Sequence, residues 1–259
     1  MSSITTEQRG HLWLMGLNRA AKRNAFDPPM FFALAEALGE LERNPELWCG
    51  VVFAHGKDFS AGIDLAAFAP LFEGGQDPFA LRPGTIDPFG LRNHLSKPLV
   101  VAVQGISFTI AIEMLLASDI RIAASDVRFA QIEVARGLYP LGGATFRLVR
   151  EAGWGNAMRY LLTGEEFGAD AALKLGLIQE ITEPGQQVER AIELASKIAE
   201  QAPLGVQATL RSAWKSILEG EAQAAADVAD DMPAIFKSQD FAEGVASFRE
   251  RRKARFTGK

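Results

Sequence analysis

Two glutamates lie inside the most apolar stretch of this chain, residues 99–134, and they restrict what that stretch can become. Leu99–Val103 is an apolar run of strand length, Gly105 predicts a turn, and Glu113 follows in a segment with a helical period. Two short strands are expected next, the second ending at Glu133. Because burying an ionised carboxylate without a partner is costly, each glutamate needs a partner or a raised pKa.

The two glutamates have two interpretations. A single glutamate in such a place would most simply cap or pair locally. Two carboxyl groups on adjacent elements of one core unit are also what acid–base catalysis requires, because one group can hold a proton while the other accepts one. From the residues alone, both interpretations stand.

The first half of the chain alternates strand and helix signals. Residues 11–17 and 49–54 predict strands. Between them a helix is expected to begin at Asp27, whose carboxylate can accept backbone N–H bonds. The tight loop of residues 56–62 has small residues where a backbone must approach something closely. Residues 66–95 contain several prolines and four scattered phenylalanines without a period, which predicts a long irregular excursion.

The second half becomes helical. Residues 144–152, 156–162 and 169–175 predict short helices, and 177–181 a further strand. From Val188 onward the pattern is helical, with breaks expected at Pro203, at Gly220 and around Pro233.

The composition excludes several classes of protein. The net charge of −5 has no concentrated basic patch, so no nucleic-acid partner is expected. No apolar run of membrane-spanning length and no signal-peptide pattern is visible, so a cytoplasmic protein that contacts no membrane is expected. Cys49 lies in an apolar run and is interpreted as a core thiol. The three histidines share no motif, so no metal site is expected.

The chain resembles the crotonase superfamily, whose archetype is enoyl-CoA hydratase. The resemblance rests on Glu113 and Glu133, on Asp58–Asp64 (DFSAGID) upstream of them and on Arg136–Pro140 downstream. It runs from Leu17 to Phe256, nearly the whole chain. Together these motifs are specific, although each alone would be weak.

The resemblance implies a fold and an assembly. The fold class is α/β, a crotonase-like spiral of β-β-α units in residues 1–200 with a helical C-terminal trimerisation region in residues 201–259. A homotrimer or a dimer of trimers is the implied assembly.

The resemblance also implies roles for residues. Glu113 and Glu133 are the catalytic acid and base, and the backbone N–H groups of Ile63 and Ile110 form an oxyanion hole for the thioester. Contacts with substrate and CoA are implied for Arg23, Ala25, Ser60, Ala61, Gly62, Asp64, Leu65, Pro140 and Leu141. The basic residues Arg19, Lys22 and Arg23 are either a solvated turn or a contact with the CoA phosphates.

One segment departs from the family pattern. Archetypal hydratases have glycines where this chain has Thr109, Ile110 and Ala111. A backbone donor survives such a replacement, but the added side chains fill space, so an altered acyl pocket is expected. Thr109 is also expected to cap the helix that carries Glu113.

The implied activity is addition of water across the 2,3 double bond of an enoyl-CoA thioester, or the reverse, as in fatty acid metabolism. No metal or redox cofactor is implied, because CoA is part of the substrate. Two alternatives stay open: a Δ3,Δ2-enoyl-CoA isomerase, which needs one carboxylate, and a catalytically silent acyl-CoA-binding member of the family.

Overall fold

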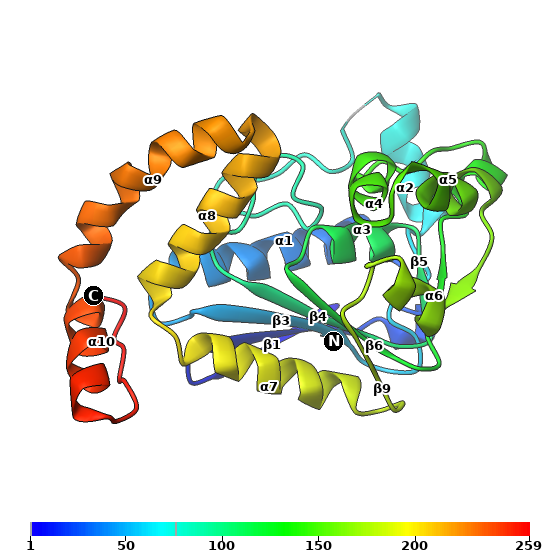
Figure 1. The fold of residues 1–259 in the computed structure, drawn as a ribbon. Helices are drawn as coiled ribbons and strands as arrows, with labels where there is room; N and C mark the ends of the chain where they lie inside the picture. Colours follow the sequence, from blue (N-terminus) through cyan, green and yellow to red (C-terminus); the bar gives the residue numbers. More distant parts are fainter. Residues whose placement is uncertain (1, 76) are drawn as a thin grey trace.

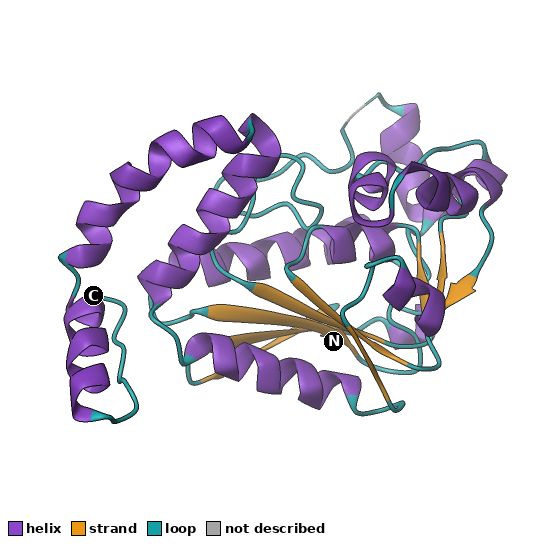
Figure 2. Ribbon diagram, viewed as in Figure 1, coloured by secondary structure: helices purple, strands orange, loops and turns teal. Residues whose placement is uncertain are grey.

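The computed structural model describes residues 2–75 and 77–259. A twisted, mostly parallel sheet forms the centre, with α1 (Pro28–Arg43) over one face and α7 (Gln187–Ala199) over the other (Figure 1). Of the remaining helices, the short ones lie toward one end of the central strands, and the long C-terminal ones lie toward the other end (Figure 2). The predicted α/β class is confirmed.

The larger sheet begins with an antiparallel pair, β1 and β2, and continues with parallel neighbours. Parallel strands need crossover connections, and the helices between them supply these. The strands in spatial order are β1 (Ile4–Arg9), β2 (Leu12–Leu17), β3 (Cys49–Ala54), β4 (Leu99–Val103), β6 (Ile120–Ala124) and β9 (Glu180–Thr182).

A smaller sheet lies beside the larger one and orients the site. Its strands in spatial order are β5 (Ile106–Phe108), β7 (Arg128–Ala130) and β8 (Phe167–Gly168). An isolated bridge joins Ser60 to Ser107 of β5, and another joins Ile63 to Phe26. The loop that contains Ile63 is therefore fixed against this sheet by backbone pairing.

Alternate residues of the central strands fill two separate cores. Val51, Val100 and Ala102 face α7, while Val52 and Val101 face α1. This alternation is what a sheet covered on both faces requires. Cys49 is buried in the α7 core, as predicted, and burial raises the pKa of its thiol.

The long excursion is partly helical. The prediction of irregular structure over residues 66–95 is wrong at its start, where α2 (Leu65–Glu73) forms with the Asp64 carboxylate accepting a hydrogen bond from the N–H of Ala67. Pro70 lies inside this helix and hid its period. The rest of the excursion, residues 77–95, has neither helix nor strand, as expected.

Two other expectations need correction, and three strands were not predicted. Glu133 does not end a strand: β7 stops at Ala130, and Glu133 opens the 3₁₀ turn η2 (Glu133–Arg136). The helix α9 (Glu221–Phe236) runs through Pro233 and ends after it. The edge strand β1 was missed because its polar residues hide the strand pattern, and β5 and β8 were missed because they are too short to show one.

The other helices lie mainly in the second half of the chain. They are η1 (Ala20–Lys22), α3 (Ile110–Leu116), α4 (Ala144–Ala152), α5 (Trp154–Thr163), α6 (Ala169–Lys174), α8 (Pro203–Glu219) and α10 (Gln239–Glu250).

The helices α8 and α9 pack on each other, and α9 and α10 extend away from the sheet (Figure 1). They expose large apolar side chains, among them Leu218, Phe236 and Phe248, the last 84% exposed. The division of the chain after residue 200 stays a prediction. None of the helices in the described residues has both the length and the apolar character needed to cross a membrane.

Candidate active site

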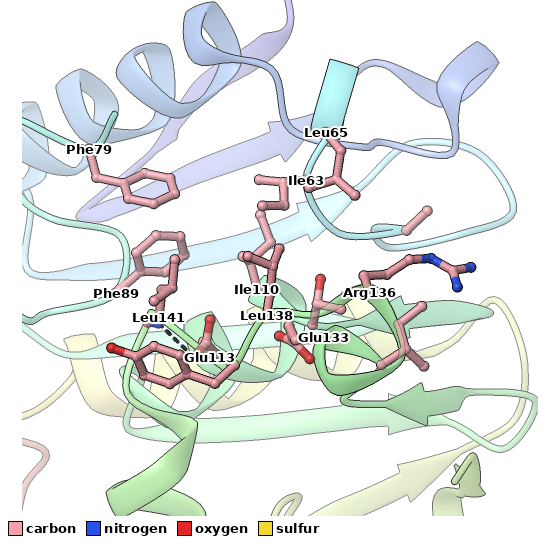
Figure 3. A pocket seen from close by; sticks show the side chains of 15 residues that line it. Ile63, Leu65, Phe79, Phe89, Ile110, Glu113, Glu133, Arg136, Leu138 and Leu141 are labelled. Atoms are coloured by element: carbon pink, nitrogen blue, oxygen red, sulfur yellow. Dashed lines mark hydrogen bonds between the residues drawn. The ribbon is translucent and has the colours of Figure 1, made fainter. Parts of the chain in front are cut away.

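A cavity of about 210 Å³ opens where the loop after β3, the start of α3 and the segment after β7 meet (Figure 3). Its walls are apolar except for two carboxyl groups, a threonine, an arginine and a tyrosine. The lining residues are Ala61, Ile63, Leu65, Phe79, Phe89, Thr109, Ile110, Glu113, Ile132, Glu133, Arg136, Leu138, Tyr139, Leu141 and Gly142.

Glu113 lies in the first turn of α3 and is 1% exposed. Its Oε1 accepts hydrogen bonds from the backbone N–H groups of Gly142 at 2.6 Å and Ala144 at 3.2 Å. Burial raises the pKa of this carboxyl to about 7, while those amides and the charge of Arg147 act in the opposite direction. Gly142 has no room for a side chain, because a Cβ there would lie 2.6 Å from Glu113 Oε2.

Glu133 opens η2 and faces the same cavity. Burial raises its pKa to about 7 as well, and the neighbouring Glu113 charge adds to the increase. The hydrogen-bond pattern orients the amide of the buried Gln131 so that its nitrogen donates to both carboxylate oxygens of Glu133, at 3.1 and 3.2 Å, and to the carbonyl oxygen of Thr109 at 3.2 Å. Gln131 therefore links Glu133 to the start of α3.

The two carboxyl groups form one electrostatic unit. Burial raises the pKa of each to about 7, and the Glu113 charge adds to the increase at Glu133. The first proton therefore leaves the pair more readily than the second. With both pKa values raised to about 7, the pair can supply a carboxylic acid and a carboxylate near neutral pH.

Two backbone amides at the cavity wall are free to bind an anion. Within residues 2–75 and 77–259, neither the N–H of Ile63 nor that of Ile110 has a hydrogen-bond acceptor. In the bridge with Phe26, the carbonyl of Gly62 accepts from the N–H of Phe26 and the N–H of Asp64 donates to the carbonyl of Phe26, so the N–H of Ile63 takes no part. Ile110 is the first residue of α3, where N–H groups lack intrahelical acceptors. Backbone N–H groups without acceptors are the kind of donor that stabilises a developing negative charge.

Thr109 turns the chain so that α3 can begin at the cavity. Its φ of 53° and ψ of −114° lie in a region that β-branched residues rarely occupy. Thr109 occupies the expected N-cap position of α3, but its side chain makes no cap hydrogen bond and Oγ1 is buried without a partner. That side chain packs against Gly62, where a Cβ would overlap Oγ1. Position 62 of the loop therefore has to be glycine, because the Thr109 side chain fills the space of a Cβ.

The structure brings part of the predicted site into the cavity. Both glutamates, both oxyanion residues and Ala61, Leu65 and Leu141 line it. Ser60 and Asp64 instead shape the loop: Ser60 Oγ donates to the carbonyl of Asn24 at 2.8 Å, and Asp64 caps α2. The remaining predicted contacts do not line this cavity; they are Arg23, Ala25, Gly62 and Pro140.

The basic segment after β2 divides into two parts. Arg19 is engaged within the protein, because its guanidinium pairs with Asp64 at 3.1 Å and Asp27 at 3.2 Å. Lys22 and Arg23 are exposed on the surface, with Arg23 reaching Asp58 only at 4.0 Å. Of the three, Lys22 and Arg23 are therefore the ones accessible to an anionic ligand.

Sequence reasoning missed several residues of the site. Gln131 is a buried polar side chain two positions before Glu133, and that spacing was the only available signal. Gly142 and Arg147 gave no signal in the sequence, because Gly142 matters through its contact with Glu113 and Arg147 through its bonds to residues 89–90. No cluster of His, Cys, Asp and Glu in the described part of the chain could hold a metal ion.

Comparison with known proteins places this geometry in a family. The family model for enoyl-CoA hydratase/isomerase matches residues 7–259. This chain therefore belongs to the enoyl-CoA hydratase/isomerase family, as its sequence motifs predicted.

Particular relatives agree with this assignment. A crystal structure of a probable enoyl-CoA hydratase/isomerase from Mycobacterium abscessus is 45% identical, covers 99% of both chains and has a TM-score of 0.95. Enoyl-CoA hydratase EchA19 from Mycobacterium tuberculosis is 34% identical, over 96% of this chain and 94% of its own. Short-chain-enoyl-CoA hydratase from Clostridium acetobutylicum is 28% identical, over 98% and 97% respectively. The prediction of a hydratase-like enzyme of the crotonase superfamily is confirmed at this level.

Proposed function

We propose that this protein adds water across the 2,3 double bond of an enoyl-CoA thioester, using Glu113 and Glu133 together. The observation that supports the proposal most strongly is a pair of carboxyl groups, both with a pKa near 7, beside two unpaired amides in one apolar cavity. An acid and a base tuned to the working pH are the groups that hydration of a double bond needs.

The proposed reaction uses each group once. The thioester oxygen accepts hydrogen bonds from the N–H groups of Ile63 and Ile110, which draws electron density from C3. The carboxylate of the pair takes a proton from water while the water oxygen bonds to C3. The electrons of the double bond move toward the thioester, and the negative charge on its oxygen is stabilised by the two amides. The carboxylic acid then donates its proton to C2, so the elements of water are added and the pair has exchanged its proton.

Loss of absorbance from the conjugated thioester tests this proposal directly. Purified protein should consume crotonyl-CoA and yield 3-hydroxybutyryl-CoA, identified by mass. Absence of product from a panel of 2-enoyl-CoA esters with different chain lengths would contradict the proposal.

Two further measurements separate the two other functions from hydration. An isomerase would convert a 3-enoyl ester into a 2-enoyl ester and would need only one carboxylate. A silent acyl-CoA-binding protein would gain thermal stability from CoA esters without turnover. The raised pKa of Glu133, to which the Glu113 charge contributes, favours hydration. An isomerase moves one proton with one carboxylate and has no use for a second carboxyl group with a raised pKa.

The substrate is proposed to carry its own CoA and to need no further cofactor. Phe79 and Phe89 form an apolar part of the cavity wall, which fits an apolar acyl chain. The exposed Lys22 and Arg23 could neutralise the CoA phosphates, because flexible cations do this without strict geometry.

The assembly is proposed to be a homotrimer or a dimer of trimers. The apolar side chains exposed along α8, α9 and α10 need a partner surface, and closed symmetry is the common solution. Analytical ultracentrifugation at micromolar concentration tests this, and a monomer would contradict it.

A further inference from the structure

The cavity has a wall whose shape is not maintained by regular structure. Phe79 and Phe89 come from residues 77–95, which form neither helix nor strand. Their rings pack edge to face with centroids 5.4 Å apart, and Phe31 of α1 contacts both. Since this segment has no ladder of hydrogen bonds, its backbone groups are satisfied by local turns, such as the N–H of Gly90 donating to the carbonyl of Asp87, and by side chains.

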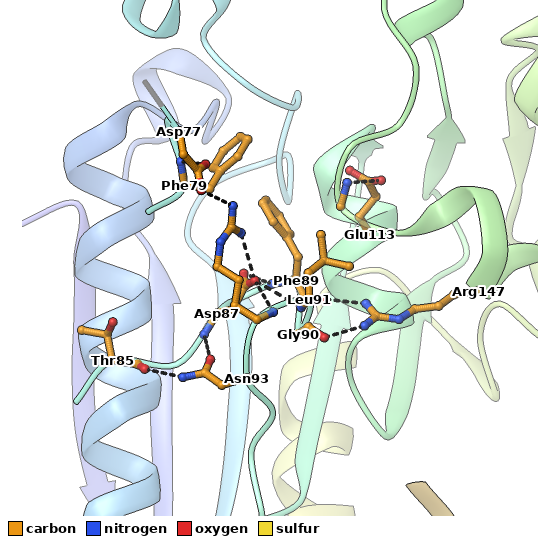
Figure 4. Close-up of polar contacts among 12 residues, drawn as sticks. Asp77, Phe79, Thr85, Asp87, Phe89, Gly90, Leu91, Asn93, Glu113 and Arg147 are labelled. Atoms are coloured by element: carbon orange, nitrogen blue, oxygen red, sulfur yellow. Dashed lines mark hydrogen bonds and ion pairs between the residues drawn. The ribbon is translucent and has the colours of Figure 1, made fainter. Parts of the chain in front are cut away.

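Asp87 satisfies the donors inside the segment. Its side chain has no exposed surface, and its carboxylate accepts from the N–H groups of Phe89 at 2.9 Å, Leu91 at 3.1 Å and Arg92 at 3.2 Å (Figure 4). The guanidinium of Arg92 adds a contact at 3.3 Å. A single buried carboxylate thus fixes the turn that carries Phe89.

Arg147 satisfies the acceptors of the same turn from another element. It lies on α4, is 3% exposed, and donates through its guanidinium to the carbonyl oxygens of Phe89 and Gly90, the latter at 2.7 Å (Figure 4). A planar guanidinium suits two adjacent acceptors, whereas an ammonium group does not hold both in a fixed geometry.

The same short segment of chain reaches the catalytic carboxyl. The N–H groups of Gly142 and Ala144 hold Glu113, and Arg147 follows within one turn of α4. The charge of Arg147 also lowers the pKa of Glu113. Residues 142–147 therefore contact both the carboxyl group and the phenylalanine wall.

The charged groups around these residues come from several elements. Arg147 faces Asp87 and His94 from the excursion, Glu113 from α3 and Arg150 from its own helix. Glu113 faces Glu133 from η2 as well as Arg147. Of the cations among these groups, Arg147 is the one that influences Glu113 directly.

We propose that Arg147 and Asp87 are positioning residues that hold the wall of Phe79 and Phe89 against residues 142–147, the segment that orients Glu113. They thereby determine which acyl chains react. The inference rests on the proposed hydration reaction. Neither residue lines the cavity, so both act through the groups they hold.

The test compares Arg147→Met, Arg147→Lys and Asp87→Asn with the wild-type protein. The kcat/KM values for crotonyl-CoA, 2-octenoyl-CoA and cinnamoyl-CoA are measured together with the melting temperature. We expect the ratio between short and long esters to change by about fivefold or more in all three variants, because the fit of the pocket decides between acyl chains of different length. Arg147→Lys retains the charge and is the variant expected to fold best.

A charge-matched control distinguishes the inference from general damage. Arg150 lies one turn further along α4, pairs with Glu151 at 3.9 Å and stacks over Trp214, and unlike Arg147 its guanidinium makes no hydrogen bond to residues 77–95. Arg150→Met should leave the ester ratios unchanged. In Arg147→Met, the limb of the pH profile governed by Glu113 should also move to higher pH, because a charge that lowers its pKa is lost. In Arg147→Lys the limb should stay in place.

The outcomes separate this inference from the proposed function. Ester ratios within about twofold of wild type in folded Arg147→Lys and Asp87→Asn would overturn the inference, since a purely structural role lowers the melting temperature without changing selectivity. If Arg147→Met does not fold, Arg147→Lys decides. Failure of the wild-type protein to hydrate any ester would instead contradict the proposed function.

Discussion

The two ends of the cavity are built in different ways. At the catalytic end, backbone groups act directly: the amides of Gly142 and Ala144 hold Glu113, and a strained Thr109 places the amide of Ile110. At the phenylalanine wall, the backbone is irregular and is maintained by the side chains of Asp87 and Arg147.

This difference matches what each end has to do. Proton transfer and oxyanion binding require groups fixed within a fraction of an ångström, which short backbone contacts provide. An acyl pocket requires only shape, and an irregular segment can change its shape without moving the carboxyl groups. Apart from Arg147, whose charge also acts on Glu113, chemistry and selectivity should therefore respond to different substitutions.

The largest effect is expected from the carboxyl pair. Glu113→Gln and Glu133→Gln should each lower kcat by about 10²- to 10⁴-fold, because each removes a proton donor or acceptor while keeping the shape. Circular dichroism should show an unchanged fold. Near-normal turnover of crotonyl-CoA by both variants would contradict the assignment.

A methyl group at Gly142 should also damage the catalytic end. Gly142→Ala places a Cβ 2.6 Å from Glu113 Oε2, so the carboxyl group must move. We expect kcat to fall by about 10²-fold, as typically follows misplacement of a reacting group by about 1 Å. Gly155→Ala is the matched control, because no atom lies within 4 Å of its added Cβ. Equal activity of the two variants would show that the contact is not needed.

Ile110 joins the two ends, since its amide belongs to the catalytic end and its side chain lines the cavity. Ile110→Gly should change the ratio of kcat/KM between short and long esters more than it changes kcat/KM for the best ester. The reason is that the fit of one methylene in a pocket is worth about 1–3 kcal/mol. Ile112→Ala is the control, because Ile112 is fully buried in the core and should affect only the melting temperature. A lower melting temperature with wild-type ester ratios in Ile110→Gly would contradict the pocket role.

The smallest effect concerns stability. Burial raises the folded-state pKa of Glu113 from 4.5 to about 7, so its ionisation is more costly in the folded protein than in the unfolded chain. This group therefore destabilises the fold increasingly as the pH rises from about 4.5 through 7. Glu113→Gln should stabilise the protein by on the order of 2 kcal/mol at pH 8 and by little at pH 4.5. Urea unfolding at both pH values measures this, and equal effects would show that the raised pKa is wrong.

The sequence predicted the catalytic end better than the wall. Glu113 and Glu133 stood out as carboxyl groups in an apolar stretch, Ile63 and Ile110 were placed by resemblance to the family's motifs, and the structure brings all four to one cavity. The central strands followed from apolar runs whose alternate residues face two cores. Short-range signals of this kind survive in a single sequence.

The missing features depend on contacts between distant parts of the chain. Arg147 reaches carbonyl oxygens of residues 89 and 90, and no periodicity indicates such a bond. The strained backbone of Thr109 contradicts the local preference of threonine, which predicted an ordinary cap. Pro70 suggested a break in a helix that forms around it. Tertiary contacts outweighed local preference in each case.

The pH dependence of kcat/KM for the best enoyl-CoA ester tests the shared proton of Glu113 and Glu133 most directly. Because burial raises the pKa of both groups to about 7 and their charges repel, the profile should be bell-shaped with one limb on each side of neutrality. Each single Glu→Gln variant should lose one limb. A wild-type profile that is flat from about pH 5 to pH 9, or a bell that persists in both variants, would contradict a two-carboxyl mechanism.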